Sequence, residues 1–208
     1  MKITDEQLRS IVDEYQKCLP GWQHVATERL LRATGPFVQA IAFQRLSGGD
    51  YRPMNCVSVL VAPAPTLRRR PDFLVQMPHG RPRTVSLQSH GKSWQQMLET
   101  MRREFIPVIT ESLDDKAVFE LCEKDAIPKS NQAYALAAAN AYYGRVDRAL
   151  YWASMFPELV NASGIPWESF QYEQKAFLDT LQGWLLRNDA RRHLETVLAQ
   201  EKTKWGVA

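Results

Sequence analysis

The feature that most constrains the fold of this chain is a change of hydrophobic period, from two residues in the first half to helical spacing in the second. Residues 36–46, PFVQAIAFQRL, alternate between two sets of side chains, and residues 55–62, NCVSVLVA, are rich in β-branched residues. The glycines of SGGD at 47–50 supply a turn between them, so we expect an antiparallel hairpin. From about Lys92 onward the apolar residues recur at helical spacing. Strands and helices that are segregated along the chain predict an α+β fold.

Three further segments extend the predicted sheet. Residues 26–34, ATERLLRAT, fit a strand before the hairpin, although the same letters also suit a short helix. Residues 72–77 and 83–89 are short strand candidates flanked by prolines, which cannot donate to a β-ladder. We therefore expect an antiparallel β-meander of four or five strands, with short members towards its end.

Helices are expected before and after this meander. Thr4 and Gln7 have the spacing of a capping box, which predicts an N-terminal helix over residues 4–18. Pro20 and Gly21 end it, because neither residue continues a helix comfortably. The helical C-terminal half is expected to contain helices at 93–113, with a kink or break at Pro107, and at 116–125, 132–144, 146–156, 170–189 and 190–205.

Length and charge suggest one domain with two unlike surfaces. A chain of 208 residues that is 45% hydrophobic can bury a generous core, so we expect a single compact domain over 1–208. Residues 1–91 would form the helix and sheet, and residues 92–208 the helical subregion. Residues 1–110 hold 15 Lys and Arg against 9 Asp and Glu, a charge of +6, and residues 111–208 hold 11 against 14, a charge of −3. A basic first half therefore precedes an acidic second half.

The sequence contains no recognisable catalytic or metal-binding constellation. The cysteines Cys18, Cys56 and Cys122 lie far apart without a CxxC pair, and no two of the four histidines have metal-ligand spacing. Histidines in predicted loops, such as His79 and His90, are expected to be solvated. The first residues form no secretory signal, and no apolar run reaches the length of a membrane span, about 18 residues. We expect a cytoplasmic protein outside the membrane, without enzymatic activity, metal or cofactor.

An arginine-rich stretch at residues 63–83, PAPTLRRRPDFLVQMPHGRPR, is the most distinctive local feature. Arginine makes bidentate contacts to carboxylates or phosphates, and the prolines stiffen the loop, which lowers the entropic cost of binding. A solvated loop, a protein-docking surface and a nucleic-acid contact all fit the stretch, and nucleic acid fits less well because aromatic residues for base stacking are few. The predicted partner-binding residues are Arg68, Arg69, Arg70, Asp72, Arg81 and Arg83.

Two resemblances bear on function. Residues 131–157, NQAYALAAANAYYGRVDRALYWASMFP, resemble one tetratricopeptide helix pair, with Gly144 at the turn and Ala137, Ala149 and Ala153 as small contact residues. The overall layout of helix, sheet and helical tail resembles small bacterial proteins that act as immunity proteins against toxins. That resemblance implies binding and neutralisation of a cognate toxin, through the arginine loop or through the acidic helical half. A nucleic-acid-associated protein and an enzyme with an unrecognised site remain the alternatives, and the oligomeric state stays open.

Overall fold

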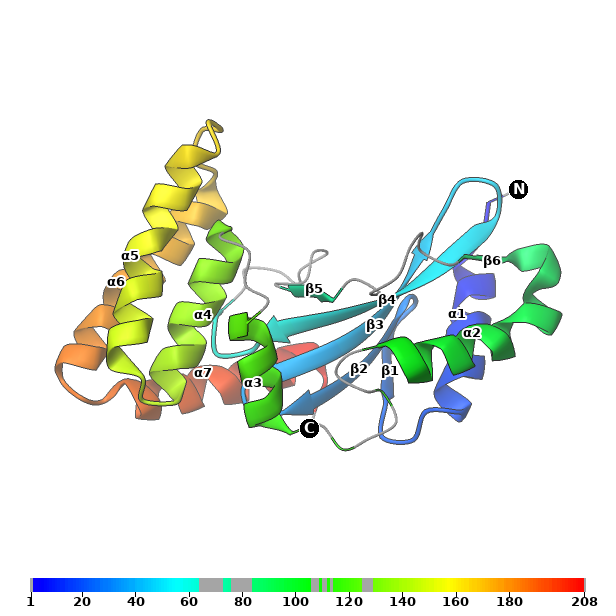
Figure 1. Cartoon of the computed structure of the whole chain (residues 1–208), viewed down its shortest axis with the longest axis horizontal. Coiled ribbons are helices and arrows are strands. Elements are labelled where there is room, and N and C mark those ends of the chain that lie inside the picture. Colours follow the sequence, from blue (N-terminus) through cyan, green and yellow to red (C-terminus); the bar gives the residue numbers. More distant parts are fainter. Residues whose placement is uncertain are drawn as a thin grey trace.

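The structure is a computed structural model that describes residues 2–63, 84–105, 109, 112, 114–124 and 129–207, together with the backbone of 73–75 (Figure 1). It confirms the α+β fold, with an N-terminal helix, an antiparallel sheet and a helical C-terminal half. The helices are α1 (Asp5–Lys17), α2 (His90–Glu104), α3 (Asp115–Lys124), α4 (Ser130–Tyr142), α5 (Val146–Ala162), α6 (Ser169–Leu186) and α7 (Ala190–Trp205). The strands are β1 (Gln23–Ala26), β2 (Arg29–Thr34), β3 (Phe37–Arg45), β4 (Asp50–Val59), β5 (Phe73–Val75) and β6 (Val85–Ser86), and a 3-10 turn, η1 (Leu87–Ser89), precedes α2.

The predicted meander of four or five strands is confirmed. The order is β1-β2-β3-β4-β5, every pair is antiparallel, and the two-residue β6 pairs with β4 beside its first residues. Residues 26–34, which suited either a strand or a helix, contain β2, whose pairing with β3 decides between the two. Strand β1 was not predicted from the sequence.

Strand β4 begins at Asp50, five residues before the predicted start at Asn55, and contains Pro53. The Leu46 N–H donates to the Asp50 carbonyl at 2.8 Å, so in an antiparallel ladder the pair Phe43–Pro53 is a non-hydrogen-bonded pair. The backbone nitrogen of Pro53 therefore faces away from β3. On that side of β4, Pro53 lies between the residues that pair with β6 and those that pair with β5, so no ladder hydrogen bond is lost. A proline fits a strand at such a position.

Helix α1 follows the sequence prediction closely. Gln7 Oε1 accepts from the Thr4 N–H at 3.0 Å and Thr4 Oγ1 accepts from the Gln7 N–H at 3.2 Å, which completes the predicted capping box. Helix α2, which follows the sheet in the sequence, ends at Glu104, whereas the predicted helix continued to residue 113. Helix α5, in contrast, continues past the predicted end at Phe156.

One face of the sheet carries two separate apolar cores, one on the right and one on the left of Figure 1. Helices α1 and α2 cover Leu30, Ile41 and Phe43. Helices α3 and α4 cover Phe37 and Val59, with α5 and α6 packed behind α4. Phe37 and Phe43 lie on the same face of β3 because side chains alternate along a strand.

Helix α7 connects the helical bundle with the opposite face of the sheet. Leu194 near its start is buried in the bundle core, whereas Trp205 at its end packs against Leu31, Val38 and Leu60. Gly206 then ends the helix in the left-handed conformation, with φ of 67°. A single long helix thus contributes to two of the three apolar clusters.

Helix α4 lies at the centre of the bundle. All of its residues from Gln132 to Tyr142 are buried, and α3, α5, α6, α7 and β4 surround it. A helix buried on every side needs small residues where neighbours approach, and alanine fills six of these positions: Ala133, Ala135, Ala137, Ala138, Ala139 and Ala141. The predicted hairpin of α4 and α5 is present, with Gly144 at its turn at a φ of 71°.

Candidate functional site

The arginine loop predicted as the binding site lies outside the residues that the structure describes. This holds for all six predicted site residues, Arg68, Arg69, Arg70, Asp72, Arg81 and Arg83. Two neighbouring arginines of the basic first half are described, and both bind within the chain. Arg45 pairs with the Asp5 carboxylate, and Arg52 donates to the Gln44 side chain. These two arginines hold the N-terminus and the β3–β4 hairpin in place.

Four polar side chains, Glu14, Tyr15, Tyr51 and His90, form what we call the tyrosine–histidine network between α1, β4 and α2. The two hydroxyl oxygens are 3.1 Å apart, Tyr51 Oη lies 2.8 Å from His90 Nδ1, and His90 Nε2 lies 2.9 Å from a Glu14 carboxylate oxygen. Because a carboxylate only accepts, His90 Nε2 donates to Glu14. In a neutral ring, Nδ1 then accepts from the Tyr51 hydroxyl, whose oxygen is left to accept from Tyr15.

This network joins secondary-structure elements and offers no activated nucleophile. Tyr15 and Tyr51 are fully buried, and burial raises the pKa of both hydroxyls, so both stay protonated at neutral pH. Trp94 packs its ring against Tyr15 and His90, with centroid distances of 5.5 Å and 6.3 Å. The expectation that His90 is a solvated loop residue is wrong: it begins α2, and its side chain is 12% exposed. The sequence carried no signal that would pair it with a helix so far away in the chain.

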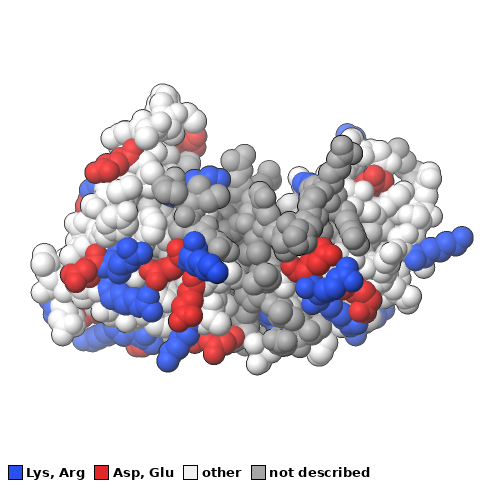
Figure 2. Space-filling model, in the orientation of Figure 1, with Lys and Arg blue, Asp and Glu red and all other residues white. Residues whose placement is uncertain are grey.

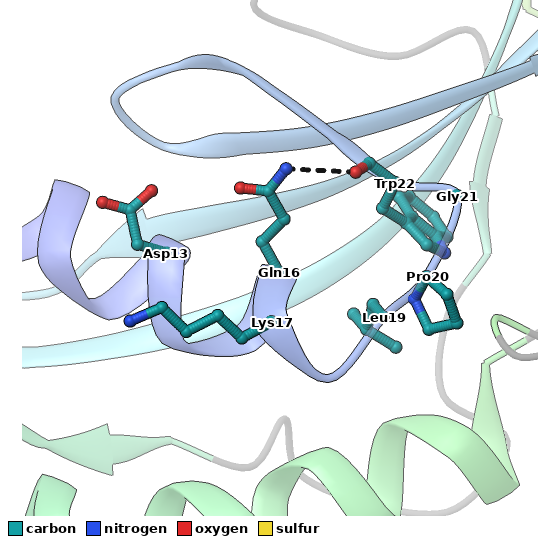
Figure 3. A pocket seen from close by; sticks show the side chains of 7 residues that line it. All are labelled: Asp13, Gln16, Lys17, Leu19, Pro20, Gly21 and Trp22. Carbon is teal, nitrogen blue, oxygen red and sulfur yellow. Dashed lines mark hydrogen bonds between the residues drawn. The ribbon is translucent and has the colours of Figure 1, made fainter.

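A hollow of about 410 Å³ lies where α1 ends and the chain turns towards β1 (Figure 3). Its polar groups are largely engaged within the chain. Gln16 Nε2 donates to the Trp22 carbonyl at 3.2 Å, Asp13 Oδ1 lies 2.6 Å from His24 Nδ1, and the Arg32 guanidinium stacks 4.8 Å from the Trp22 ring. Its lining residues are Asp13, Gln16, Lys17, Leu19, Pro20, Gly21 and Trp22.

A row of polar side chains crosses β2, β3 and β4 between the two apolar cores. Arg32 Nε donates to Gln39 Oε1 at 2.8 Å, and Gln39 Nε2 donates to Asn55 Oδ1 at 2.9 Å. The register places Arg32 directly opposite Gln39, and Asn55 diagonally across from Gln39 on the same face of the sheet. Burial lowers the pKa of Arg32 to about 10, which leaves it charged at neutral pH, and the carbonyl of Ile109 accepts a further bond from it at 3.4 Å. Gln39 and Asn55 are completely buried, so their mutual bond satisfies groups that cannot reach water.

Three of the seven exposed large apolar side chains of the described residues, Ile165, Phe170 and Tyr172, lie at the connection between α5 and α6. We call this region, residues Ile165, Trp167, Glu168, Phe170 and Tyr172, the α5–α6 turn surface. Ile165 is 62% exposed and Tyr172 is 61% exposed. In Figure 1 this turn forms the outer end of the bundle, away from the sheet. Tyrosine and tryptophan at an exposed position are typical of protein interfaces.

Two contacts hold the aromatic part of the turn surface in place. Trp167 Nε1 donates to Asn161 Oδ1 at 2.7 Å, and the Trp167 ring meets the buried Phe156 ring edge-on at 6.0 Å. The Tyr172 ring lies 5.1 Å from Trp167. These contacts with Asn161 and Phe156 fix the Trp167 ring in the free protein, which reduces the conformational entropy lost when a partner binds. This segment was not predicted as a binding site from the sequence, although its aromatic residues follow the loop NASGIP directly.

The described part of the chain holds no cluster of three or more His, Cys, Asp or Glu side chains that could bind a metal ion. Among the same residues, no helix is both long enough and apolar enough to cross a membrane. Cys56 and Cys122 are buried, and burial raises the pKa of the Cys56 thiol to about 12. Cys56 is therefore an unreactive thiol at neutral pH.

No protein-family model, curated protein or solved structure matches this chain. The resemblances to toxin-immunity proteins and to a tetratricopeptide helix pair accordingly stay predictions. The α5–α6 turn surface, which holds three of the seven exposed large apolar side chains among the described residues, is the candidate binding surface.

Proposed function

We propose that this chain is a non-catalytic protein-binding protein, most concretely an immunity protein that binds and neutralises a bacterial toxin in the cytoplasm. The observation that carries the proposal is the α5–α6 turn surface. It presents Tyr172, which is 61% exposed, beside the partly buried Trp167, whose indole N–H donates to Asn161. Large aromatic side chains contribute most of the free energy of binding in many protein interfaces.

The polar clusters support the same proposal in a second way. In the tyrosine–histidine network and in the row from Arg32 to Asn55, the polar groups bind one another. Such groups stabilise the fold, since a buried polar atom without a partner costs about 1–3 kcal/mol. The polar side chains of these two clusters are therefore assigned to the fold, and the α5–α6 turn surface is the candidate for recognition.

The experiment that tests the proposal is co-purification of the tagged protein from its native host, together with expression of the neighbouring gene. We expect the neighbouring product to be a toxin that forms a complex with this protein and kills cells that lack it. Failure of the two products to associate in a purified mixture would count against the proposal.

The nucleic-acid alternative depends on the arginine loop and is tested by the same preparation. Contacts to phosphates release counterions, so binding to generic DNA or RNA should weaken steeply as salt rises. Binding that shows this salt dependence, without any protein partner, would favour the alternative.

A further inference from the structure

The sequence around the α5–α6 turn surface carries negative charges only. From Ala149 to Gln174 the sequence contains three glutamates and no lysine, arginine or aspartate. All three glutamates, Glu158, Glu168 and Glu173, are exposed, and none forms an ion pair with another described residue. In Figure 2 the upper end of the bundle is white with red side chains on its flanks. Trp167 and the exposed Tyr172 therefore lie in a surface whose carboxylates form no ion pair with any other residue that the structure describes.

The rest of the bundle shows which side chains this protein places on its aromatic rings. The Arg191 guanidinium lies 3.5 Å from the centroid of the Tyr142 ring, and that of Arg148 lies 5.4 Å from Tyr151. These are cation–π contacts, which the negative face of an aromatic ring stabilises. Among the described residues, no cation occupies a comparable position on Trp167 or Tyr172. The Trp167 and Tyr172 rings, 5.1 Å apart and tilted by 40°, offer the same chemistry to a cation from outside.

We propose that the α5–α6 turn surface binds an arginine- or lysine-bearing segment of a protein partner. A cationic side chain of that segment lies against the Trp167–Tyr172 pair, and the glutamates bind the remaining positive charges. This inference rests on the proposed function and specifies the chemistry of its partner. Nucleic acids and anionic membranes are disfavoured at this surface, because their phosphates would face uncompensated carboxylates.

The test is an NMR titration of the full chain with a short arginine-bearing peptide and with the same peptide in which neutral citrulline replaces each arginine. The reporter is the Trp167 indole N–H resonance, assigned by its absence in Trp167→Phe. We expect the arginine peptide to shift this resonance at low salt, and the citrulline peptide to bind about tenfold more weakly. Tyr172→Ala should weaken the arginine peptide by a similar factor, and because Tyr172 is 61% exposed its truncation leaves the bundle folded.

Charge variants show whether the effect belongs to this surface. Glu158→Gln with Glu173→Gln removes two of the three glutamate charges in the stretch Ala149–Gln174, and Glu168 is left in place because it is the N-cap residue of α6. The matched control, Glu120→Gln with Glu195→Gln, removes the same charge from exposed helical positions elsewhere. We expect the first pair to lower the affinity for the arginine peptide about tenfold. The control pair should leave that affinity within about twofold of the wild-type value.

The inference is overturned if both peptides bind equally well, if the Trp167 resonance does not move, or if the two charge pairs act alike. Its failure is distinguishable from failure of the proposed function. A protein partner that co-purifies equally with wild type, with Tyr172→Ala and with the Glu158–Glu173 pair would retain the protein-binding function and refute this site. Arginine-peptide binding with no protein partner would support the site and refute the function.

Discussion

At the α1–α2 end of the sheet, Tyr15 and Tyr51 are fully buried with their hydroxyls hydrogen-bonded, whereas Tyr172 at the outer end of the bundle is 61% exposed. The same residue type thus occupies two different environments. A buried tyrosine contributes ring packing and a satisfied hydroxyl, so replacing it changes stability. An exposed tyrosine on an anchored ring pair contributes little to stability and leaves its ring for a partner.

The interiors of the two ends differ as well. Aromatic side chains fill the space between α1, α2 and the sheet, where the Tyr15 and Phe43 rings lie 4.9 Å apart. The bundle instead encloses an alanine-rich helix, α4, whose neighbours approach on every side. Ring packing tolerates small adjustments of each ring, but a close approach of helices leaves no volume for larger side chains. Substitutions at the two ends of the molecule test this contrast through their effects on the free energy of unfolding.

The largest effect is expected from Ala137→Leu in α4. Ala137 is completely buried in the bundle core, so three added carbon atoms must displace neighbouring helices. We expect the free energy of unfolding to fall by about 3 kcal/mol, as measured by urea denaturation. Ala176→Leu, at an exposed position of α6, is the control and should change stability by less than about 0.5 kcal/mol. Equal effects at both positions would show that α4 is not tightly packed.

Tyr51→Phe is expected to cost about 2 kcal/mol, because it leaves His90 Nδ1 and the Tyr15 hydroxyl without their common partner in a buried site. Tyr172→Phe removes the same atom from an exposed ring and should change the free energy of unfolding by less than about 0.5 kcal/mol. Denaturation of the two variants in parallel gives the comparison directly. A neutral Tyr51→Phe would mean that the network contributes nothing to stability.

Glycines at the two ends should also respond differently. Gly35, in the turn between β2 and β3, has a φ of 48°, and an added Cβ would lie 2.7 Å from Asp115 Oδ2, which Tyr143 holds by a hydrogen bond. Gly35→Ala is therefore expected to lower the free energy of unfolding by about 1.5 kcal/mol. Gly91 in the first turn of α2 has open space around it, so Gly91→Ala should be neutral or stabilising by about 0.5 kcal/mol. Thermal unfolding of both variants tests the difference.

The smallest effect on the free energy of unfolding at neutral pH comes from ionisation of the tyrosine hydroxyls, which changes stability only at alkaline pH. Burial raises the pKa of Tyr15, Tyr51 and Tyr143 above the ordinary value of 10.0. A pKa that is higher in the folded state stabilises the fold fully below pH 10, and this contribution is lost as the pH rises further. We expect stability to be insensitive to these groups at pH 8 and to fall above about pH 10.

Two variants divide this alkaline loss between the ends of the molecule. Tyr51→Phe should remove part of the loss at the α1–α2 end, and Tyr143→Phe part of the loss at the α3–α4 end. Urea denaturation across the alkaline range measures both. A wild-type stability that stays constant above pH 10 would contradict the assigned burial.

The local sequence pattern was a reliable guide where neighbouring residues decide the structure. The capping box of Thr4 and Gln7, the strand over Phe37–Arg45 and the turn at Gly144 were all predicted and are present. The start of β4 was missed, because a proline at position 53 argues against a strand unless its orientation in the ladder is known. Strand β1 was missed because its four residues show no alternation of buried and exposed side chains. Its extended structure depends on pairing with β2.

The candidate sites were harder to predict than the fold. The arginine loop was chosen for its charge, and its residues lie outside those described. Position 90 was expected to be a solvated histidine, and only the meeting of α1, β4 and α2 gives it Tyr51 and Glu14 as partners. The α5–α6 turn surface was overlooked, although the absence of basic residues between Ala149 and Gln174 could have marked it.

The sequence by itself determined the order of elements, the α+β class and the alanine-rich centre of the bundle, since period, capping and residue size act between neighbours in the chain. The tertiary structure alone decided which polar side chains are satisfied and which aromatic side chains stay exposed. Tyr51 and Tyr172 are the same residue type, but Tyr51 is buried and Tyr172 is exposed. The difference depends on whether a second element of the fold covers the ring. Burial depends on contacts between distant segments, which no local pattern contains.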